Sequence, residues 1–369
     1  MRELRVLFIS RKHPPAVGGM ERLSLYLVQN VSRMPDVRSQ SIVWGHGQRL
    51  LPLFAVLAVI RGIWACLPGI DVIHIGDPVL SWLGLLLKRL FRVPIAITVH
   101  GLDLTFSLPL YQTLVPKWVK RYDKIICISQ FAYEISLGRG MPVERCVIIR
   151  PGVEVPNVTN TKSESRQILA QSVDRNWSGA KLLLTVGRLV PRKGVFFFID
   201  QVLPQLAASD SSFVYVVVGR GPDHDRIQQA VKVHGLQEQV CLVGYLPPDL
   251  LLHAYNACDL FLAPNVPQPH DVEGFGLVIL EAAAVGCPVL VSDIEGLRDT
   301  ISADSGGWFV PVGRPDTWFQ QINALFKEPD YLVAAGLMAR SYVAAQCTWS
   351  LMAEKYVDEF RRLSGNDRT

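Results

Sequence analysis

The chain has 369 residues, of which 49% are hydrophobic and 19% are charged, and its formal net charge is +4. This composition excludes a disordered chain, and the length is sufficient for two domains of ordinary size. The seven cysteines are scattered and no pair has the spacing of a metal site, so we expect reduced thiols in a cytosolic protein. Residues 1–10 do not resemble a signal peptide, because their apolar run is only as long as a strand.

Charge is distributed unevenly along the chain. Residues 1–150 carry 19 Lys and Arg but only 9 Asp and Glu, whereas the remainder has an excess of acidic residues. A basic N-terminal half predicts either attraction to anionic lipid or an anionic substrate, or a solvated face without a partner. The sequence has no arginine-rich tract or zinc-ligand spacing that would indicate a nucleic-acid partner.

Residues 50–67 are almost wholly apolar, with interruptions at Pro52, Arg61 and Gly62. A membrane-spanning helix needs roughly 20 apolar residues, and this segment is slightly too short and too interrupted. Two interpretations are left open. The segment is either a buried helix of an α/β domain or a helix that lies on a membrane surface.

The first half of the chain alternates apolar strand patterns with helical stretches. Strands are expected at 5–10, 39–44, 71–75, 94–99, 124–128 and 148–153, and the first helix at about 20–32. This alternation predicts βαβ units and a parallel sheet. Ligands of such sheets bind at the carboxyl ends of the strands, so the residues that follow each strand are candidates for function.

Two loops of the first half carry such candidates. Gly18 and Gly19 lie between the first strand and its helix, where backbone can approach a ligand closely, although a full G-x-G-x-x-G fingerprint is missing. His100 directly follows the strand at 94–99, and Asp103 comes three residues later. A lone histidine at this position is either functional or satisfied by the surrounding structure.

The second half repeats the alternation after a polar segment at 154–179, which is the expected linker. Strands are expected at 181–186, 213–218, 240–243, 260–263 and 289–292, each running into a polar or glycine-containing loop. The chain is therefore predicted to contain two doubly wound α/β domains in tandem. A last helix at about 350–364 is amphipathic, with Met352, Tyr356 and Phe360 at helical spacing.

The central segment of the second domain begins at Glu273. Gly274 and Gly276 make its first part a loop, and a helix is expected from Leu277 to about residue 285. Such a helix start exposes backbone N–H groups and the positive end of the helix dipole, which suits phosphate. Glu273 and Glu281 flank this helix start. Two carboxylates would be unfavourable beside a phosphate unless they bind neutral hydroxyl groups. A nucleotide sugar offers both groups.

Arg188 and Lys193 lie five residues apart on a loop bounded by Gly187 and Gly194. Two fixed cations suit a diphosphate, since Arg binds as a fork and Lys as a point charge. A nucleoside diphosphate gains negative charge as it leaves a sugar, so these cations would stabilise the transition state more than the ground state. The alternative is a pair of surface charges.

Five motifs together resemble a known family. They are Gly18-Gly19, His100-Gly101-x-Asp103, Gly187-Arg188-x4-Lys193-Gly194, Gly219-x-Gly221-Pro222 and Glu273-Gly274-Phe275-Gly276-x4-Glu281. Over nearly its whole length the chain resembles a retaining glycosyltransferase of the GT-B, family 4 type. The resemblance implies an α/β GT-B fold, two Rossmann-like doubly wound domains with an interdomain cleft. Residues 1–155 would bind the acceptor, 156–345 the nucleotide sugar, and 346–369 would form a helix that crosses back.

The resemblance also implies a role for each matching residue. Glu273 and His100 would contact the donor sugar, Arg188 and Lys193 the diphosphate, and Glu281 the ribose. Asp103 is a candidate on the acceptor side. The other donor-binding residues would be Gly18, Gly19, Gly219, Gly244, Tyr245, Leu246, Phe275, Gly276 and Leu277. Such enzymes use no cofactor and no metal, because the two cations take the place of a divalent ion.

The resemblance further implies retention by front-face attack, in which the departing phosphate oxygen deprotonates the acceptor hydroxyl. A hydrolase pair is rejected, because a helical turn and a phosphate would separate Glu273 from Glu281. The loop ending in Asp271-Val272-Glu273-Gly274 is similar to family members that use GDP-mannose, while UDP-glucose, UDP-galactose and UDP-GlcNAc stay open. The expected acceptor is a saccharide or a lipid-linked saccharide of cell-surface glycans.

Other interpretations differ in testable ways. An epimerase of the same fold would need acid and base groups around C2 of the sugar and no acceptor pocket. A non-catalytic homologue would be expected to lose Arg188, Lys193 or Glu273, all of which are present. The expected location is the cytoplasm, either free or at the inner face of the membrane.

Overall fold

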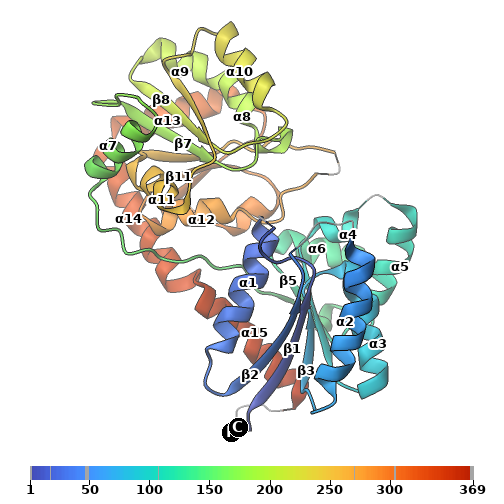
Figure 1. Ribbon diagram of the computed structural model, residues 1–369. Coiled ribbons are helices and arrows are strands. Elements are labelled where there is room, and N and C mark those ends of the chain that lie inside the picture. Colours follow the sequence, from blue (N-terminus) through green and yellow to red (C-terminus); the bar gives the residue numbers. More distant parts are fainter. Residues whose placement is uncertain are drawn as a thin grey trace. The chain divides into compact units, whose positions relative to one another are not determined.

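The computed structural model describes residues 2–16, 18–45, 50–106, 108–269, 271–302 and 305–365. The chain divides into two compact units (Figure 1). Unit 1 comprises Met1–Gly152 together with Cys347–Thr369, and unit 2 comprises Val153–Gln346. The sequence had suggested divisions after residues 155 and 345. Each unit is described by itself below.

Unit 1 is built on a six-stranded parallel sheet of order β2-β1-β3-β4-β5-β6. The strands are short apolar runs, most of them buried on both faces, as parallel strands require. They are β1 Leu4–Ser10, β2 Val37–Val43, β3 Val72–Ile75, β4 Ile95–Val99, β5 Lys124–Cys127 and β6 Cys146–Ile148. The helical segments are α1 Gly19–Ser32, α2 Leu51–Cys66, η2 Pro78–Leu80, α3 Ser81–Phe91, α4 Leu102–Thr105, α5 Pro109–Val119, α6 Gln130–Gly138, η3 Val143–Arg145 and α15 Trp349–Ser364.

The C-terminal helix α15 packs in unit 1 beside α1, as Figure 1 shows. Its apolar face inserts Phe360 edge-on against Phe8 of β1, with ring centroids 6.0 Å apart. Its Tyr356 hydroxyl shares a hydrogen bond of 2.9 Å with Thr98 of β4. Thr348 caps the helix start, and Gly365 ends it in the left-handed conformation. The amphipathic pattern at 350–364 thus marks a helix that covers a sheet built 200 residues or more earlier in the chain.

Residues 51–66 form helix α2 of the α/β unit, but the expectation of a buried helix is correct for one face only. Phe54, Ala58, Gly62 and Cys66 form the buried stripe, at a spacing of four residues. Gly62 permits close contact with Leu87 of α3, since an added Cβ would lie 3.0 Å from the Leu87 side chain. The opposite face is exposed although it is also apolar. Among the described residues, no helix has the length and apolarity that a membrane span requires.

Unit 2 contains a second six-stranded parallel sheet, of order β12-β11-β10-β7-β8-β9. Its strands are β7 Lys181–Val186, β8 Phe213–Val218, β9 Val240–Gly244, β10 Leu260–Ala263, β11 Val289–Ser292 and β12 Gly307–Val310. The sequence analysis missed β12. The helical segments are α7 Lys162–Ser172, η4 Pro191–Lys193, α8 Val195–Phe197, η5 Phe198–Val202, α9 Leu203–Ser209, α10 His224–Val233, α11 Pro248–Ala257, α12 Leu277–Ala284, η6 Glu295–Asp299, α13 Pro315–Lys327 and α14 Pro329–Gln346.

Both sheets have a topological switch point, where successive connections leave in opposite directions. In unit 2 the strands β8 and β9 follow on one side of β7, whereas β10, β11 and β12 follow on the other. In unit 1 the switch lies between β1 and β3. Loops at the carboxyl ends of such strand pairs diverge and leave a crevice for ligands. The loops after β7 and β10 are therefore the expected position of a ligand site in unit 2.

We predict that buried His74 makes unit 1 sensitive to acid. Burial, with a smaller contribution from His100, lowers the pKa of His74 from 6.5 to about 3. As the pH falls the unfolded chain binds this proton first, so stability is lost between about pH 6.5 and pH 3, by at most about 1.4 kcal/mol per pH unit. The free energy of unfolding, measured with urea at several pH values in this range, should depend less steeply on pH for His74→Phe than for the wild type. Equal slopes would contradict the assignment.

Candidate functional site

The loop after β7 is held against the end of β10 by a close backbone contact. It runs from Gly187 through η4 to Gly194, which has a φ of 65°. A Cβ at Gly194 would overlap the carbonyl oxygen of Pro264, directly after β10. Only glycine combines this backbone conformation with this approach. The contact brings the two loops of the unit 2 switch point together.

Glu273 is the centre of the charged cluster between these loops. Its side chain is 8% exposed, and its Oε2 atom accepts a hydrogen bond of 2.9 Å from the Asn265 side chain. The same oxygen forms ion pairs with Lys193 Nζ, at 2.6 Å, and with the Arg192 guanidinium. Arg192 also binds Asp271 through Nε, at 3.0 Å. The cluster therefore ties a cationic loop after β7 to an acidic loop after β10.

The two cations keep Glu273 ionised despite its burial. Burial alone would raise the pKa of this carboxyl group, but the charges of Lys193 and Arg192 outweigh it and lower the pKa below the ordinary value of 4.5. Among the described residues, Glu273 Oε1 has no hydrogen-bond partner, whereas Oε2 has three. The carboxylate is thus fixed by one oxygen and can accept hydrogen bonds through the other.

A third loop, after β11, fixes the backbone at Glu273. Glu295 accepts a hydrogen bond of 2.8 Å from the Glu273 N–H through Oε2, and the Gly296 N–H donates to the Glu273 carbonyl. A Cβ at Gly296 would overlap the Gly274 carbonyl. Burial raises the pKa of Glu295, and the nearby charge of Glu273 adds to this effect. Sequence reasoning missed these residues, whose only signal was their place after a strand.

Helix α12 begins directly after this cluster, as expected, with Gly276 as its N-cap. Gly276 and Leu277 are buried, and the first backbone N–H groups of the helix have no partner within the helix. One turn further along, Glu281 accepts a hydrogen bond of 2.8 Å from the hydroxyl of Tyr255 on α11. Tyr255 was not predicted. It orients Glu281 much as Lys193 orients Glu273.

Three glycines form a backbone junction at the ends of β7, β8 and β9. The Gly219 N–H donates to the Gly244 carbonyl at 2.7 Å, and a Cβ at Gly219 would overlap the Gly187 carbonyl. Beyond this junction Tyr245 is exposed, whereas Leu246 is buried. The predicted donor-binding residues Gly219, Gly244, Tyr245 and Leu246 therefore come together at one sheet edge.

The two predicted cations of the β7 loop are not equivalent. Lys193 passes along the Gly187 backbone, where an added Cβ would lie 3.5 Å from Lys193 Cε, and it ends on Glu273. Arg188 is exposed, and it forms no ion pair with another described residue. The side chain that shares Glu273 with Lys193 is Arg192, which the sequence analysis did not single out.

The candidates in unit 1 lie at the carboxyl edge of its sheet. His100 is buried, its backbone N–H donates to the Asp103 carboxylate, and its Nε2 atom lies 3.1 Å from the Gly76 carbonyl. Burial raises the pKa of Asp103, with His100 opposing the shift. Gly18 is the N-cap of α1, and Gly19 is its first residue. Their roles toward a donor stay predictions.

A buried ion pair that was not predicted spans the switch point of unit 1. Arg11 follows β1 and Asp77 follows β3, and the Arg11 Nε atom donates to Asp77 Oδ1 at 2.9 Å. Asp77 is fully buried, and it also caps η2 by accepting from the Val79 N–H. Among the described residues no three His, Cys, Asp or Glu side chains gather as a metal site would need.

Two family models match the chain. The model for glycosyl transferases group 1 matches residues 170–341, and the model for glycosyltransferase family 4 matches residues 5–155. The first match lies within unit 2, and the second covers unit 1 up to Gly152 and the first three residues of unit 2. The two sheets with their flanking helices have the GT-B architecture. The family matches and the fold thus define a GT-B glycosyltransferase. The chain belongs to the glycosyl transferases group 1 family.

Relatives and solved structures agree with this assignment. The chain is 26% identical over 294 residues to a phosphatidyl-myo-inositol mannosyltransferase of Mycobacterium leprae, covering 79% of this chain and 73% of that protein. It is 26% identical over 266 residues to a GDP-mannose-dependent alpha-(1-6)-phosphatidylinositol monomannoside mannosyltransferase of Mycobacterium tuberculosis, covering 71% and 68%. Alignments with other curated relatives span as little as 55% of the relative's length.

The fold is also that of Anabaena HepE, whose structure was solved in complex with UDP. The TM-score is 0.79 at 17% sequence identity, and the superposition covers 97% of this chain and 100% of HepE. At this identity the likeness concerns the fold. It supports the arrangement of two doubly wound sheets predicted from the sequence.

We predict that Gly194→Ala disrupts the loop contact of unit 2. The alanine side chain would strain the left-handed backbone and also overlap the Pro264 carbonyl. The free energy of unfolding should therefore fall by clearly more than the roughly 1–3 kcal/mol that backbone strain alone costs. Gly235→Ala is the matched control, because Gly235 has nearly the same φ, 66°, and nothing within 4 Å of an added Cβ. The free energies of unfolding of both variants measure the difference. Equal losses would show that the contact with Pro264 is unimportant.

Proposed function

We propose that this group 1 glycosyltransferase is a metal-independent, retaining hexosyltransferase. In this reaction a sugar passes from a nucleoside-diphosphate sugar to a hydroxyl of a saccharide or lipid-linked acceptor. The observation that carries the proposal is the carboxylate of Glu273, which is bound to two cations through one oxygen beside the N-terminus of α12. That arrangement offers an anion site and a hydroxyl acceptor in adjacent positions.

The diphosphate is the natural occupant of the anion site. The N–H groups at the start of α12 and the positive end of its dipole attract phosphate oxygens. Lys193 supplies a fixed charge, and the exposed guanidinium of Arg188 supplies one that can move onto the ligand. As the glycosidic bond breaks, both charges stabilise the leaving diphosphate more than the intact donor.

The sugar and the nucleoside then lie on either side of the diphosphate. Glu273 Oε1 accepts hydrogen bonds from sugar hydroxyls, with Phe275 and Gly276 in the loop beneath. Glu281, held by Tyr255, binds the ribose diol. The base lies near the glycine junction, where the exposed ring of Tyr245 can stack on it.

Retention in this proposal follows from front-face attack. The acceptor hydroxyl approaches the anomeric carbon on the side from which the diphosphate leaves. The departing phosphate oxygen takes the hydroxyl proton, the new glycosidic bond forms, and the diphosphate carries away the electron pair of the broken bond. Neither Glu273 nor Glu281 acts as a nucleophile. His100 contacts the donor sugar, and Asp103 contacts the acceptor.

GDP-mannose is the favoured donor. The loop that ends at Glu273, with Asp271 held by Arg192, matches the sequence pattern of family members that use it. The name of the Mycobacterium tuberculosis relative, a GDP-mannose-dependent enzyme, gives further support. The UDP complex of HepE keeps UDP-hexoses as the second choice. The protein would act in the cytoplasm, in peripheral contact with the membrane, on acceptors for cell-surface glycans.

A donor panel tests the reaction. GDP-mannose, UDP-glucose, UDP-galactose and UDP-GlcNAc are incubated with the protein in EDTA or in Mg²⁺, and released nucleoside diphosphate is measured. We expect release from one donor, preferably GDP-mannose, at the same rate in EDTA as in Mg²⁺. Epimerised donor without release would indicate the epimerase alternative, and a thermal shift by GDP or UDP without turnover the non-catalytic one. The absence of both nucleoside diphosphate release and a thermal shift by GDP or UDP would contradict the proposal.

We predict that Glu273→Gln and Lys193→Met each lower kcat by at least about a hundredfold, because each removes a group that acts on the sugar or on the leaving diphosphate. Gln and Met retain the size of the native side chains, so thermal unfolding should show that both variants fold, with a lowered midpoint because each loses part of a buried ion pair. The exposed Lys232→Met serves as the control and should transfer sugar at the wild-type rate. Wild-type kcat in either site variant would refute its assigned role.

We further predict that Glu281→Gln raises the donor KM about tenfold and leaves kcat nearly unchanged, because a ribose contact is the same in the ground state and in the transition state. Tyr255→Phe should change KM in the same direction and by less, since it only orients Glu281. Steady-state kinetics at saturating acceptor separate the two constants. A fall in kcat without a change in KM would place Glu281 in the chemical step instead.

A further inference from the structure

Exposed apolar side chains are concentrated on one part of unit 1. Of the seventeen large apolar residues that are exposed among the described residues, ten lie between Leu50 and Leu110. Five of them form a stripe on α2 and at its end, and they are 50% to 70% exposed: Leu53, Val56, Ile60, Trp64 and Leu67. At 100° per residue they fall within about 80° of arc and extend over roughly 21 Å. We call this set the α2 stripe.

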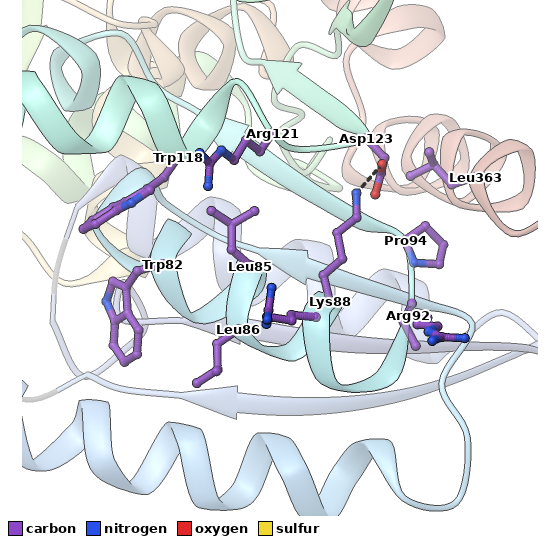
Figure 2. A pocket seen from close by; sticks show the side chains of 12 residues that line it. Trp82, Leu85, Leu86, Lys88, Arg92, Pro94, Trp118, Arg121, Asp123 and Leu363 are labelled. Carbon is purple, nitrogen blue, oxygen red and sulfur yellow. Dashed lines mark hydrogen bonds and ion pairs between the residues drawn. The ribbon is translucent and has the colours of Figure 1, made fainter.

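Helices α3 and α5 add an open groove beside α2, which packs on α3 through Gly62 and Leu87. The groove has a volume of about 980 Å³. Figure 2 shows Trp82 and Trp118 at one end, Arg92 and Pro94 at the other, and leucines of α3 between them. Trp118 also lines a second apolar hollow of about 370 Å³ with the exposed Leu108 and Leu110. Trp118 therefore lies between two neighbouring hollows, and α3, which lines the groove, also packs on α2.

The charges on this face are of one sign. The segments that form α2, α3 and α5 contain Arg61, Lys88, Arg89 and Lys117 but no Asp or Glu. Arg89, Arg92 and Arg121 line the groove and are exposed, and none of the three forms an ion pair with another described residue. Asp123 is the one acidic residue of the groove lining, and it is bound to Lys88 at 2.5 Å.

We infer that the α2 stripe and the groove form a docking surface for an anionic phospholipid bilayer. This inference deepens the peripheral membrane contact proposed above by assigning it to named residues. Leucine, isoleucine and tryptophan side chains of the stripe enter the interface between headgroups and acyl chains. Arg89, Arg92 and Arg121 bind lipid phosphates at the groove, and Trp64, Trp82 and Trp118 lie at headgroup depth, where indole rings are favoured.

Charge complementarity selects this occupant over a second copy of the chain. A twofold contact would place the stripe and its cations against themselves, so that Arg61, Arg89 and Arg92 would face like charges. An anionic bilayer instead offers negative charge and apolar depth together. The half-buried geometry of α2 fits this partner, because a helix that lies in the interface needs one face for the protein and one for lipid.

Vesicle flotation of the full-length protein tests the surface. Wild-type protein is mixed with vesicles of phosphatidylcholine alone or of phosphatidylcholine with phosphatidylglycerol, at about 0.05 M and about 0.5 M NaCl. We expect flotation with the anionic vesicles, weakened at high salt. Ile60→Ser with Trp64→Ser should reduce vesicle partitioning at least about tenfold, since both side chains lose apolar contact. Val333→Ser with Leu337→Ser on α14, two exposed apolar residues at the same spacing, is the control and should float like the wild type.

A second pair of variants separates the groove from the general basic charge of unit 1. Arg89→Gln with Arg92→Gln should weaken binding to anionic vesicles about fivefold for each charge removed. Arg33→Gln with Arg38→Gln removes the same charge from exposed positions outside the groove, at the C-cap of α1 and on β2, and should bind nearly as well as the wild type. Equal losses in both variants would overturn the groove as the phosphate site.

Other outcomes overturn the surface as a whole. Absence of flotation by the wild type, or unchanged flotation by Ile60→Ser with Trp64→Ser, would do so. A wild-type dimer in sedimentation that this variant converts to a monomer, without vesicle binding, would assign the stripe to a second copy. Donor turnover is measured for every variant without vesicles. Turnover without flotation contradicts the docking surface alone, whereas flotation without turnover contradicts the proposed reaction alone.

Discussion

The structure of unit 2 depends on a buried carboxylate that two cations hold in place. Isolating Glu273 in an apolar environment would cost several kcal/mol or force it to take up a proton. Arg192 and Lys193 reverse this tendency and lower its pKa. The partners come from loops about 80 residues apart, so the ion pairs determine how the loops after β7 and β10 meet. Gly194 makes that meeting possible, since its backbone contacts Pro264 directly.

The same cluster prepares the site before any ligand arrives. Because Glu273 already binds Lys193 and Asn265, the proposed reaction would require little reorganisation of the carboxylate or the ammonium as charge develops on the leaving group. Glu295 and Gly296 fix the backbone at Glu273 from a third loop. Tyr255 orients Glu281 by a hydrogen bond from its hydroxyl group. The candidate site is thus supported by residues from three loops and from helix α11.

Sequence patterns could predict the frame of this site but not its supports. Continuous apolar runs followed by glycine mark β7, β8 and β9, and the two glycines before Leu277 mark the start of α12, so these elements were expected at nearly the observed residues. Arg192 and Tyr255 carry no local signal, because their roles arise from contacts with Glu273 and Glu281, which are distant in sequence. The buried face of α2 was equally hidden, since apolar residues on both faces remove the periodicity that distinguishes inside from outside.

A comparison of the two switch points supports the proposal that unit 2 binds the donor. Each switch point is spanned by an ion pair between the loops of its flanking strands, Arg11 with Asp77 in unit 1 and Lys193 with Glu273 in unit 2. Both carboxylates use a single oxygen for their structural partners, since Asp77 Oδ1 binds Arg11 and caps η2, whereas Asp77 Oδ2 has no hydrogen-bond partner among the described residues. Asp77 is fully buried, however, whereas Glu273 is 8% exposed and lies just before the start of α12. An ion pair that leaves a carboxylate oxygen available, next to a helix start, combines support with recognition, and this combination is what a donor with both phosphate and hydroxyl groups requires.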